Sequence, residues 1–323
     1  MKKLLVLTSG GDAPGMNAAL RAVVRSGYYY DFQVFGCRGG YDGLIANDIF
    51  SLKSNDVANI IQRGGTVLQT GRCKAFWDQK VRAQCIDLLK RKEISSLVVI
   101  GGDGSFRGAA LLQQEGGPNV IGIPATIDND IIGTEYTIGF NTAANTALDA
   151  IDKIRDTASS HGRHFLIEVM GRRSGFLAVE VGIAGGAEII LTPEFPISNE
   201  SIVELLYNNK RKKLSNIIIV AEASSIPGRS VKIAQELKAL SGLEFKVCIL
   251  GHTQRGGSPR VTDRTIASQM GEMAVRALND NKTNLMVAIR NQQLTLTEFP
   301  PPDNPGRRFT DESLLHLNRI FCS

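Results

Sequence analysis

Two carboxylates stand at the centre of the sequence, in the segment Pro124-Ala125-Thr126-Ile127-Asp128-Asn129-Asp130. The segment follows the apolar run at residues 120–123, which predicts a buried strand ending in a loop, the place where open α/β sheets bind ligands. In an extended segment Asp128 and Asp130 point to the same side. Their charges repel unless a cation, a metal or a shared proton offsets the repulsion. The alternative is a solvated Asp-Asn-Asp turn, which these residue types favour.

Two glycine-rich loops also follow apolar runs. Residues 97–100 lead into Gly101-Gly102-Asp103-Gly104-Ser105 and then into a helical pattern at residues 106–114. A strand, a glycine turn and a helix start present backbone N–H groups to a phosphate, and an aspartate there would need Mg²⁺ between itself and the phosphate. Residues 4–7 lead into Thr8-Ser9-Gly10-Gly11-Asp12. This loop matches neither the Walker pattern nor the dinucleotide fingerprint, so the sequence disfavours a classical P-loop or Rossmann nucleotide site.

The composition is ordinary for a globular protein of about two domains. Of the 323 residues, 43% are hydrophobic and 21% are charged. No apolar run approaches the roughly 20 residues of a membrane span and no signal peptide precedes the first apolar run, so we expect a cytoplasmic protein. The five cysteines lack metal-ligand spacing, which favours reduced thiols. A net charge of +5 without an aromatic-interleaved basic tract disfavours nucleic-acid binding and suits small anionic substrates.

Short apolar runs alternate with helical patterns along the chain, which is typical of βαβ units and of parallel sheets covered by helices on both faces. A long helix near residues 141–160 is a plausible bridge between two lobes. Besides the strands named above, we expect strands at residues 34–37, 165–169, 189–191, 217–220 and 247–250. Besides the helices named above, we expect helices near residues 17–28, 57–62, 81–92, 175–183, 202–207 and 233–240.

Further motifs stand in the same order as in one known family. They are Thr70-Gly71-Arg72-Cys73, Met170-Gly171-Arg172 and the glycine-rich turn from Leu250 to Pro259. With the three loops above, they make the sequence closely resemble the bacterial ATP-dependent 6-phosphofructokinases, the phosphofructokinase A family. The resemblance runs in register from about Lys3 to about Gln293, and only the last ~30 residues look divergent.

This resemblance implies a fold and a reaction. The fold would be α/β, with two Rossmann-like three-layer α/β/α domains and mainly parallel sheets. Residues 1–139 plus 254–304 would form a larger ATP-binding domain, and residues 140–253 plus 305–323 a smaller sugar-phosphate-binding domain. The enzyme would transfer the γ-phosphoryl of ATP to the 1-hydroxyl of D-fructose 6-phosphate, giving fructose 1,6-bisphosphate and ADP in glycolysis. It would use Mg²⁺ and act as a homotetramer whose active sites take residues from two subunits.

The resemblance also implies roles for the carboxylates. Asp128 matches the family's base for the sugar hydroxyl. An aspartate suits this role because it is ionised at neutral pH and can accept the hydroxyl proton late in the reaction. Asp103 and Asp130 match the carboxylates on the magnesium side, which act partly through water. The implied catalytic set is Gly11, Arg72, Thr126, Asp128 and Arg172.

Two ligand pockets follow in the same way. The nucleotide would contact residues of the three loops and of the first further motif, namely Gly11, Arg72, Cys73, Gly102, Asp103, Gly104 and Ser105. The sugar phosphate would contact Thr126, Ile127, Asp128, Met170, Gly171, Arg172, Glu222, His252 and Arg255, with Arg163 and Lys246 reaching in from a neighbouring subunit.

Three positions, two of which depart from the family, bear on its chemistry. Lys246 stands where the family has an arginine that grips the 6-phosphate, so sugar-phosphate binding would be weaker or the sugar preference shifted. Pyrophosphate-using relatives typically have aspartate at position 104 and lysine at position 125. Those side chains fill the space of the nucleotide's α-phosphate or repel it. Gly104 and Ala125 leave this space open and therefore favour ATP, although bacterial ATP enzymes usually have glycine at position 125.

Four alternatives stay open beside the leading interpretation. One enzyme would use pyrophosphate as donor, and another would phosphorylate a different ketose phosphate. A catalytically weak sensor would have lost the aspartates, which are present here. A lipid or NAD kinase shares the Gly-Gly-Asp-Gly loop but does not need the segments at residues 170–172 and 252–255.

The family's regulatory site, which binds ADP or phosphoenolpyruvate between subunits, has a counterpart here. Its basic cluster and metal-side carboxylate match Arg21, Arg25, Arg155, Glu188, Arg211 and Lys213. Ser54 occupies a usual arginine position and Asn59 a usual aspartate position, so we expect an altered effector response.

Overall fold

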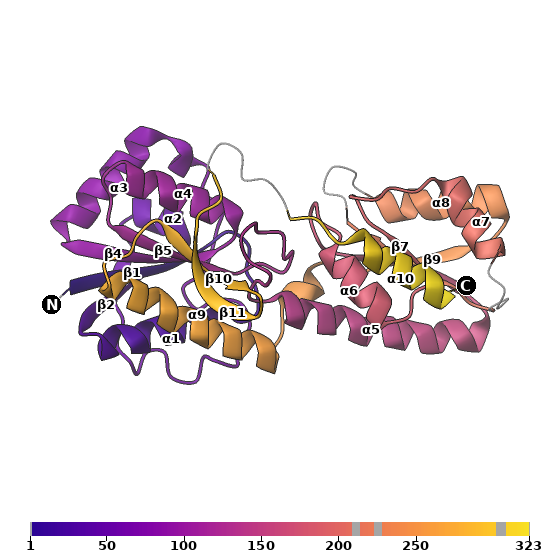
Figure 1. Ribbon diagram of the computed structural model, residues 1–323, viewed down its shortest axis with the longest axis horizontal. Helices are drawn as coiled ribbons and strands as arrows, with labels where there is room; N and C mark the ends of the chain where they lie inside the picture. Colours follow the sequence, from indigo (N-terminus) through magenta and orange to yellow (C-terminus); the bar gives the residue numbers. More distant parts are fainter. Residues whose placement is uncertain (1, 209–213, 223–227, 302–307, 323) are drawn as a thin grey trace. The chain divides into compact units, whose positions relative to one another are not determined.

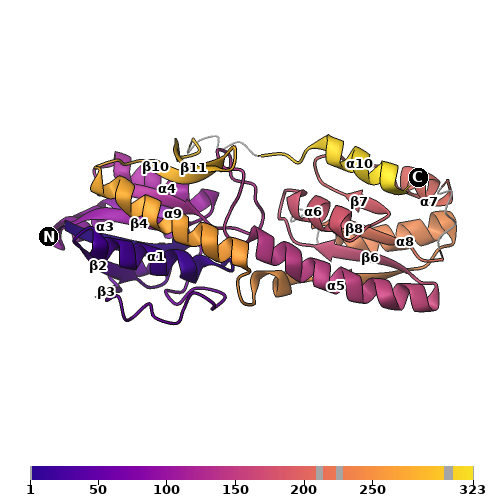
Figure 2. The ribbon, with the colours of Figure 1, turned by 60° about the horizontal axis from the view of Figure 1, so that its bottom comes forward.

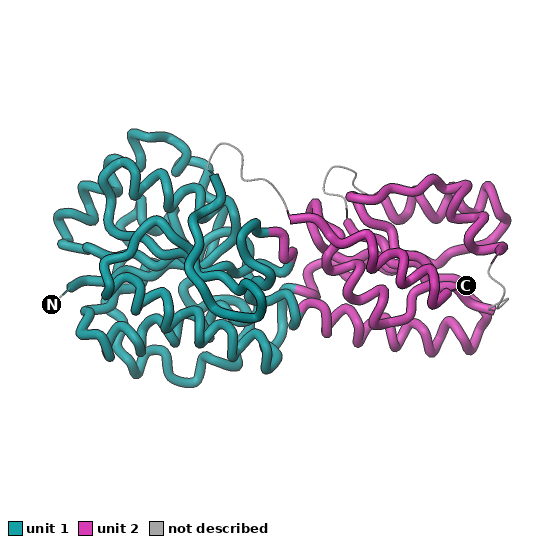
Figure 3. Tube along the Cα trace, viewed as in Figure 1, with its two compact units in different colours: residues 1–127, 131–142, 255–307 teal, residues 128–130, 143–254, 308–323 magenta. Residues whose placement is uncertain are grey.

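The computed structural model describes residues 2–208, 214–222, 228–301 and 308–322, and the chain divides into two compact units (Figure 3). Unit 1 comprises residues 1–127, 131–142 and 255–307, and unit 2 comprises residues 128–130, 143–254 and 308–323. Residues 128–130, expected in the larger domain, cluster with unit 2. The reason is local, because the Ser174 hydroxyl donates to the carbonyl of Asp128 and Arg308 Nη1 donates to that of Asn129.

Unit 1 is built on a seven-stranded sheet with the order β11-β10-β5-β4-β1-β2-β3 (Figure 1). The central strands are parallel, while the two edge strands β3 and β11 run antiparallel to their neighbours. The apolar runs of the central strands are fully buried, as expected for a sheet covered on both faces. The strands are β1 (Lys2–Ser9), β2 (Phe32–Cys37), β3 (Ile49–Ser51), β4 (Ile94–Gly101), β5 (Asn119–Pro124), β10 (Leu285–Arg290) and β11 (Gln293–Glu298).

Helices cover both faces of this sheet. The helices α1 (Met16–Tyr29) and α9 (Val261–Asn279) pack against each other on one face, which Figures 1 and 2 both show. The other face carries α2 (Gly40–Ile45), α3 (Gln79–Arg91), α4 (Asp103–Gln114) and the short 3-10 helix η1 (Ala75–Trp77). Aromatic rings fill this second layer, and the rings of Tyr41 and Phe76 stack with centroids 3.9 Å apart.

Unit 2 is built on a parallel four-stranded sheet with the order β7-β8-β6-β9. Its strands are β6 (His164–Val169), β7 (Ile189–Leu191), β8 (Ile217–Ala221) and β9 (Phe245–Ile249). Apolar side chains of α7 and α8 pack on one face of the sheet, while α6 packs on β7 and β8 and α10 packs on α6 and β7. The helices are α5 (Phe140–His161), α6 (Phe176–Ala184), α7 (Asn199–Tyr207), α8 (Arg229–Ser241) and α10 (Glu312–Cys322), with the 3-10 helix η2 (Gly251–Arg255) after β9. The predicted fold class, two α/β parts with mainly parallel sheets, is confirmed.

The strand orders place ligand-binding edges. In unit 1 the chain runs from β1 to β2 and then returns to β4 on the other side of β1, so the order reverses between β1 and β4. In unit 2 it reverses at β6, between β8 and β9. Open α/β sheets bind ligands outside the carboxyl ends of the strands at such reversals. The loops after β1, β4, β6 and β9 are therefore the expected ligand-binding loops.

Two local expectations are wrong. No helix spans residues 57–62, where turns bring Val57 and Ile60 into the core at helix-like spacing while Asn59 takes a left-handed φ of 56°. The segment around Asp128 is a turn rather than an extended strand, because Asn129 has a φ of 51°. No helix among the described residues has the length and apolar character needed to cross a membrane.

Candidate active site

The loop after β1 is tied to the segment that carries Arg72. The Gly10 N–H donates to the carbonyl of Gly71 at 3.0 Å, and the Thr70 hydroxyl donates to the carbonyl of Gly10 at 3.1 Å. The Thr8 hydroxyl donates to the carbonyl of Gln69 at 2.7 Å. These bonds between segments about sixty residues apart hold Arg72 at the carboxyl edge of the sheet.

Cys73, predicted to contact the nucleotide, carries a neutral thiol. Burial raises its pKa to about 11, and a hydrogen bond with Asp42 acts in the same direction. A thiol at that pKa is uncharged at neutral pH. Cys73 therefore adds no negative charge to a loop that is predicted to lie near phosphates.

The loop after β4 passes directly into α4. Gly102 stands before the first helical residue, Asp103, and its carbonyl accepts the N–H groups of Ser105 and Phe106. Gly101 is in register with Ser9 of β1 and with Pro124 of β5, so three loops leave the sheet at one level. The first N–H groups of α4 and the positive end of its dipole suit an anion there.

Gly11 closely approaches the side chain of Arg255 within unit 1. A Cβ at this position would lie 2.6 Å from Arg255 Nη1, which donates to the carbonyl of Asp12 at 3.0 Å. The structure thus places Arg255, expected at the sugar phosphate, beside the loop after β1. Because the clash involves the end of a long side chain, Gly11 constrains Arg255 rather than the backbone.

Thr126 and Ile127 continue from β5. The Ala125 N–H donates to the carbonyl of Gly101 at 2.9 Å, and the Thr137 hydroxyl donates to that of Thr126 at 2.7 Å. Ile127 is fully buried. These contacts fix the strand end from which the Asp128 turn leaves.

In unit 2, Asp128 lies against the loop after β6. Its side chain is buried, with the residue 4% exposed, and its carbonyl accepts the Ser174 hydroxyl at 2.9 Å. The Ser174 N–H in turn donates to the carbonyl of Gly171 at 2.8 Å. Ser174, which sequence reasoning did not select, therefore connects Asp128 to the segment that carries Arg172.

Arg172 has an unusual backbone. Its φ is 58°, in the left-handed region that non-glycine residues rarely adopt, and its N–H donates to Glu222 Oε1 at 2.9 Å. Glu222 follows β8, and its own N–H donates to the carbonyl of Val169 at 2.8 Å. Strained residues of this kind persist where the surroundings determine them. The predicted pair of Arg172 and Glu222 is thus brought together at the carboxyl edge.

Gln254 fastens the turn after β9 to the loop after β6. Its fully buried side chain accepts the Met170 N–H at 3.4 Å and donates to the carbonyl of Gly251 at 3.0 Å. His252 lies exposed in that turn. Sequence reasoning missed Gln254, although its place between His252 and Arg255 in a glycine-rich turn was a signal.

Arg163 and Lys246 do not join this edge. Arg163 directly precedes β6, and Lys246 is the second residue of β9, so both lie at the amino ends of parallel strands. Met170 follows the carboxyl end of β6, about 20 Å along the strand at about 3.3 Å per residue. Lys246 Nζ instead lies 3.1 Å from Glu244 Oε1.

A family model described as phosphofructokinase matches residues 3–278 of the chain. The chain belongs to the phosphofructokinase family. The ATP-dependent 6-phosphofructokinase of Coxiella burnetii is 54% identical over 323 residues, which cover 100% of this chain and 99% of that protein. The ATP-dependent 6-phosphofructokinase 1 of Thermus thermophilus is 48% identical over 323 residues and 100% of both chains. The resemblance found in the sequence is confirmed.

Solved phosphofructokinase structures share the fold. The phosphofructokinase of Saccharomyces cerevisiae is 33% identical with a TM-score of 0.86, over 99% of this chain and 46% of that longer chain. The pyrophosphate-dependent phosphofructokinase of Marinobacter aquaeolei is 22% identical with a TM-score of 0.80, over 100% of this chain and 92% of that chain. At this lower identity the likeness shows the fold alone.

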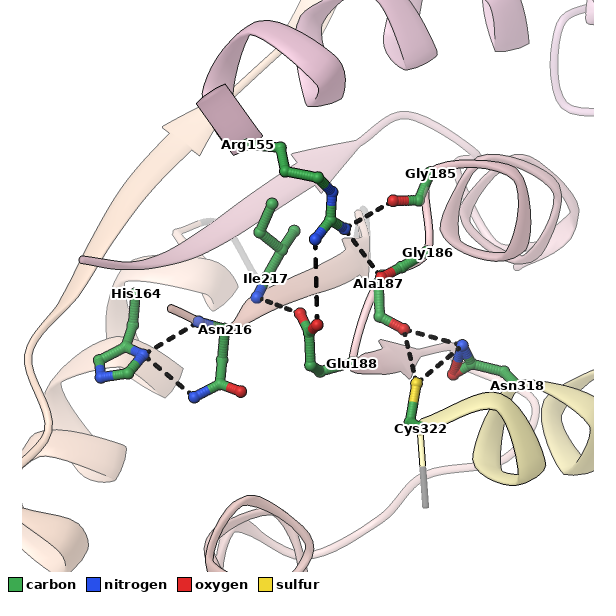
Figure 4. A network of polar contacts seen from close by, with 10 residues as sticks. All are labelled: Arg155, His164, Gly185, Gly186, Ala187, Glu188, Asn216, Ile217, Asn318 and Cys322. Atoms are coloured by element: carbon green, nitrogen blue, oxygen red, sulfur yellow. Dashed lines mark hydrogen bonds and ion pairs between the residues drawn. The ribbon is translucent and has the colours of Figure 1, made fainter. Parts of the chain in front are cut away.

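The residues expected at the family's effector site occur in both units. In unit 1, Arg21 and Arg25 are one turn apart on α1, and burial together with Arg25 lowers the pKa of Arg21. In unit 2, Arg155 Nη2 donates to the carbonyls of Gly185 and Gly186, and its Nη1 lies 3.9 Å from Glu188 Oε1 (Figure 4). Arg211 and Lys213 lie outside the described residues.

Asp263 organises unit 1 of this phosphofructokinase and was also missed by sequence reasoning. It is fully buried in the first turn of α9 and accepts the N–H groups of Gly139 and Thr142 at 2.8 Å and the Thr142 hydroxyl at 2.5 Å. The partners are more than 120 residues away in sequence. Asp263 thereby holds the start of α5 near the end of β5.

We expect Asp263→Asn to lower the free energy of unfolding by about 2 kcal/mol, because one buried N–H or hydroxyl donor loses its acceptor. Burial, the largest cause, raises the pKa of Asp263. The stability linked to its proton is therefore present below pH 3.8 and is lost as pH rises through the raised pKa. Urea unfolding across this pH range tests both effects, with exposed Asp156→Asn as control. An unchanged unfolding midpoint contradicts the assignment.

Proposed function

We propose that this chain catalyses transfer of the γ-phosphoryl of ATP to the 1-hydroxyl of D-fructose 6-phosphate, giving fructose 1,6-bisphosphate and ADP. The observation that carries the proposal is that the motif segments after β1, β4, β6 and β9 all lie at carboxyl strand ends beside a reversal of strand order. The names of the closely similar relatives support the same reaction. As a glycolytic kinase, it acts in the cytoplasm.

Unit 1 supplies the nucleotide contacts in this proposal. Backbone N–H groups of Gly11 and of the first turn of α4 meet the phosphates, and Arg72 spans the nucleotide and the sugar. The hydrogen bonds between the β1 loop and residues 69–71 support this role, because they place Arg72 beside the glycine loop without using its guanidinium. Cys73 and residues 102–105 complete the contacts.

Unit 2 supplies the acceptor side. Asp128 takes the proton of the sugar hydroxyl, and Arg172 stabilises the charge on the transferred phosphoryl. A loose transition state asks mainly for positioning and charge neutralisation, which rigidly held side chains provide. The Ser174 bond to the carbonyl of Asp128 and the Glu222 bond to the N–H of Arg172 fix the backbone from which these side chains project. The sugar-binding pocket is lined by Met170, Gly171 and His252.

Magnesium fits the donors proposed for it. Carboxylate oxygens are its preferred protein ligands, and in kinase sites one or two carboxylates hold Mg²⁺ together with substrate phosphates. Asp103 at the start of α4 and Asp130 after the Asn129 turn would hold it. When bound, the ion neutralises phosphate charge. Among the described residues no group of three or more His, Cys, Asp or Glu side chains gathers as a metal site.

The proposed assembly is a homotetramer in which a second copy completes each active site. Arg163 and Lys246 lie at the amino ends of β6 and β9, away from the carboxyl edge that carries Arg172. Two cations at that end suit the 6-phosphate of a sugar bound to a neighbouring subunit. Because both residues lie away from the carboxyl edge of their own chain, their position supports a site shared between two subunits.

The proposed effector is ADP or phosphoenolpyruvate. It would be held by Arg21, Arg25, Arg155 and Glu188 together with Arg211 and Lys213.

Steady-state turnover of fructose 6-phosphate with ATP and, separately, with pyrophosphate tests the reaction. Turnover with ATP alone is the expected result, and activity only with pyrophosphate, or none with this sugar, contradicts the proposal. We expect Gly104→Asp to raise the KM for ATP at least about tenfold by repelling phosphate. Apart from its chain neighbours and the backbone of its own helix, no atom of the described residues lies within 4 Å of a Cβ built at Gly104, so the unfolding midpoint should not change.

Lys246 should limit the affinity for the sugar phosphate. Its ammonium lies 3.1 Å from Glu244 Oε1, and that hydrogen bond is the largest cause of the lowered pKa of Glu244. A phosphate must displace this carboxylate, and lysine offers no bidentate fork in return. We expect Lys246→Arg to lower the KM for fructose 6-phosphate about three- to tenfold at unchanged kcat. A KM that does not fall removes position 246 from the sugar site, and Lys232→Arg is the control.

A further inference from the structure

Unit 2 contains a cavity of about 290 Å³ that uses none of the residues proposed for catalysis. Its walls come from β7, the segment that follows β7, α7 and α10. Most of its lining is apolar and includes Ile190, Phe195, Ile197, Leu205, Leu206 and Leu315. Apolar walls of this kind disfavour a nucleotide or inorganic phosphate, which would lose its hydration without polar partners.

Polar contacts hold two of these walls together. The carbonyl of Ala187 accepts the amide of Asn318 at 2.8 Å and the thiol of Cys322 at 3.3 Å (Figure 4). Asn318 and Cys322 belong to α10 and line the cavity, while Ala187 precedes β7. The cavity is thus bounded by elements joined through hydrogen bonds as well as by packing.

The two charged side chains that line the cavity, Glu188 and Arg319, differ in whether they already have partners. The carboxylate of Glu188 is already engaged, because its Oε2 accepts the Ile217 N–H at 2.6 Å and its Oε1 lies 3.9 Å from Arg155 (Figure 4). Arg319 is exposed and lines the cavity, and it makes no hydrogen bond or ion pair with any residue that the structure describes. The guanidinium is therefore available to an anionic group at the mouth.

We propose that this cavity binds a small carboxylic acid with a compact apolar body. The body lies against Ile190, Leu206 and Leu315, and the carboxylate meets Arg319. A dry cavity of about 150 Å³ holds benzene, so about 290 Å³ suits a ring with a short chain, such as phenylpropionate. The site shares Glu188 with the proposed effector site but no residue with the proposed catalytic set, so it does not depend on the proposed reaction.

Titration calorimetry of the full chain with phenylpropionate, and with neutral phenylpropanol, tests the proposal. Saturable binding with a Kd of about 0.1 to 1 mM is expected for a ligand of this size. Arg319→Gln should weaken the acid about tenfold and leave the alcohol unchanged, because only the acid loses a charged partner. Lys232→Gln, a charge change on α8, is the control. Failure to saturate up to the solubility of the acid, or equal loss for both ligands, overturns the proposal.

Two further measurements locate the ligand. Leu206→Trp fills the cavity and should weaken both ligands at least about tenfold, whereas Leu317→Trp on the exposed side of α10 should not. In the unmodified chain, saturating phenylpropionate should slow alkylation of Cys322 by iodoacetamide but not that of Cys248, as measured by peptide mass spectrometry. Binding that survives a folded Leu206→Trp variant, or equal protection of both thiols, places the ligand elsewhere. Turnover with ATP on the same samples judges the proposed function separately.

Discussion

Replacing Asp128 with Ser lowers kcat by about 10² to 10⁴-fold, the usual contribution of a general base to proton transfer. ATP binding should change little, because the proposed nucleotide contacts come from unit 1. The hydrogen bond from Ser174 uses the carbonyl of residue 128 and survives the substitution. The variant therefore removes the carboxylate while leaving the turn in place. Steady-state kinetics, with calorimetry of a non-hydrolysable ATP analogue, separates the two effects.

The matched control is Asp152→Ser, which removes an exposed carboxylate from α5. It should leave kcat and the affinity for nucleotide unchanged. Turnover of Asp128→Ser within about threefold of the starting enzyme rules out its role as base, given the size of that contribution. A loss of ATP affinity equal to the loss of kcat would instead assign Asp128 to the binding of the nucleotide.

Local patterns were enough to predict the central strands and the loops that follow them. The apolar runs before Gly101 and Pro124 are buried parallel strands, and their glycine- and aspartate-rich ends lie at one edge of the sheet. This worked because burial on both faces leaves a continuous apolar run in the sequence. The edge strands β3 and β11 were not predicted, because partial exposure breaks up such runs. The inner strand β10 was not predicted either, because its buried run covers only residues 286–288.

Contacts between distant segments could not be predicted. Asp263 bonds to Gly139 and Thr142, and Gln254 bonds to Met170, across separations of more than 80 residues. Nothing near Asp263 in the sequence distinguishes it from an exposed residue on a helix. The glycine-rich turn around Gln254 indicates a functional turn but not which of its polar residues is buried. The failed helix at residues 57–62 has the same cause, because buried positions three apart occur in turns as well as in helices.

Arg172 offers a test that separates the effect of a substitution on activity from its effect on stability. Removing a group that stabilises transition-state charge costs about 10² to 10³-fold in kcat, so Arg172→Ala and Arg172→Gly should both lose that much. The kcat of Arg172→Lys should lie between the kcat of these variants and that of the starting enzyme, because lysine keeps the positive charge but loses the bidentate guanidinium. The residue has a φ of 58°, which glycine adopts freely and alanine does not.

We therefore expect Arg172→Gly to be more stable to urea than Arg172→Ala by about 1 kcal/mol, although the two are equally inactive. Glu222→Gln keeps an oxygen that can accept the Arg172 N–H, so it should retain the stability of the turn. If the conformation served only the fold, Arg172→Gly would keep near-normal turnover. A glycine variant that is inactive yet more stable than the alanine variant means that backbone strain at Arg172 is retained for catalysis.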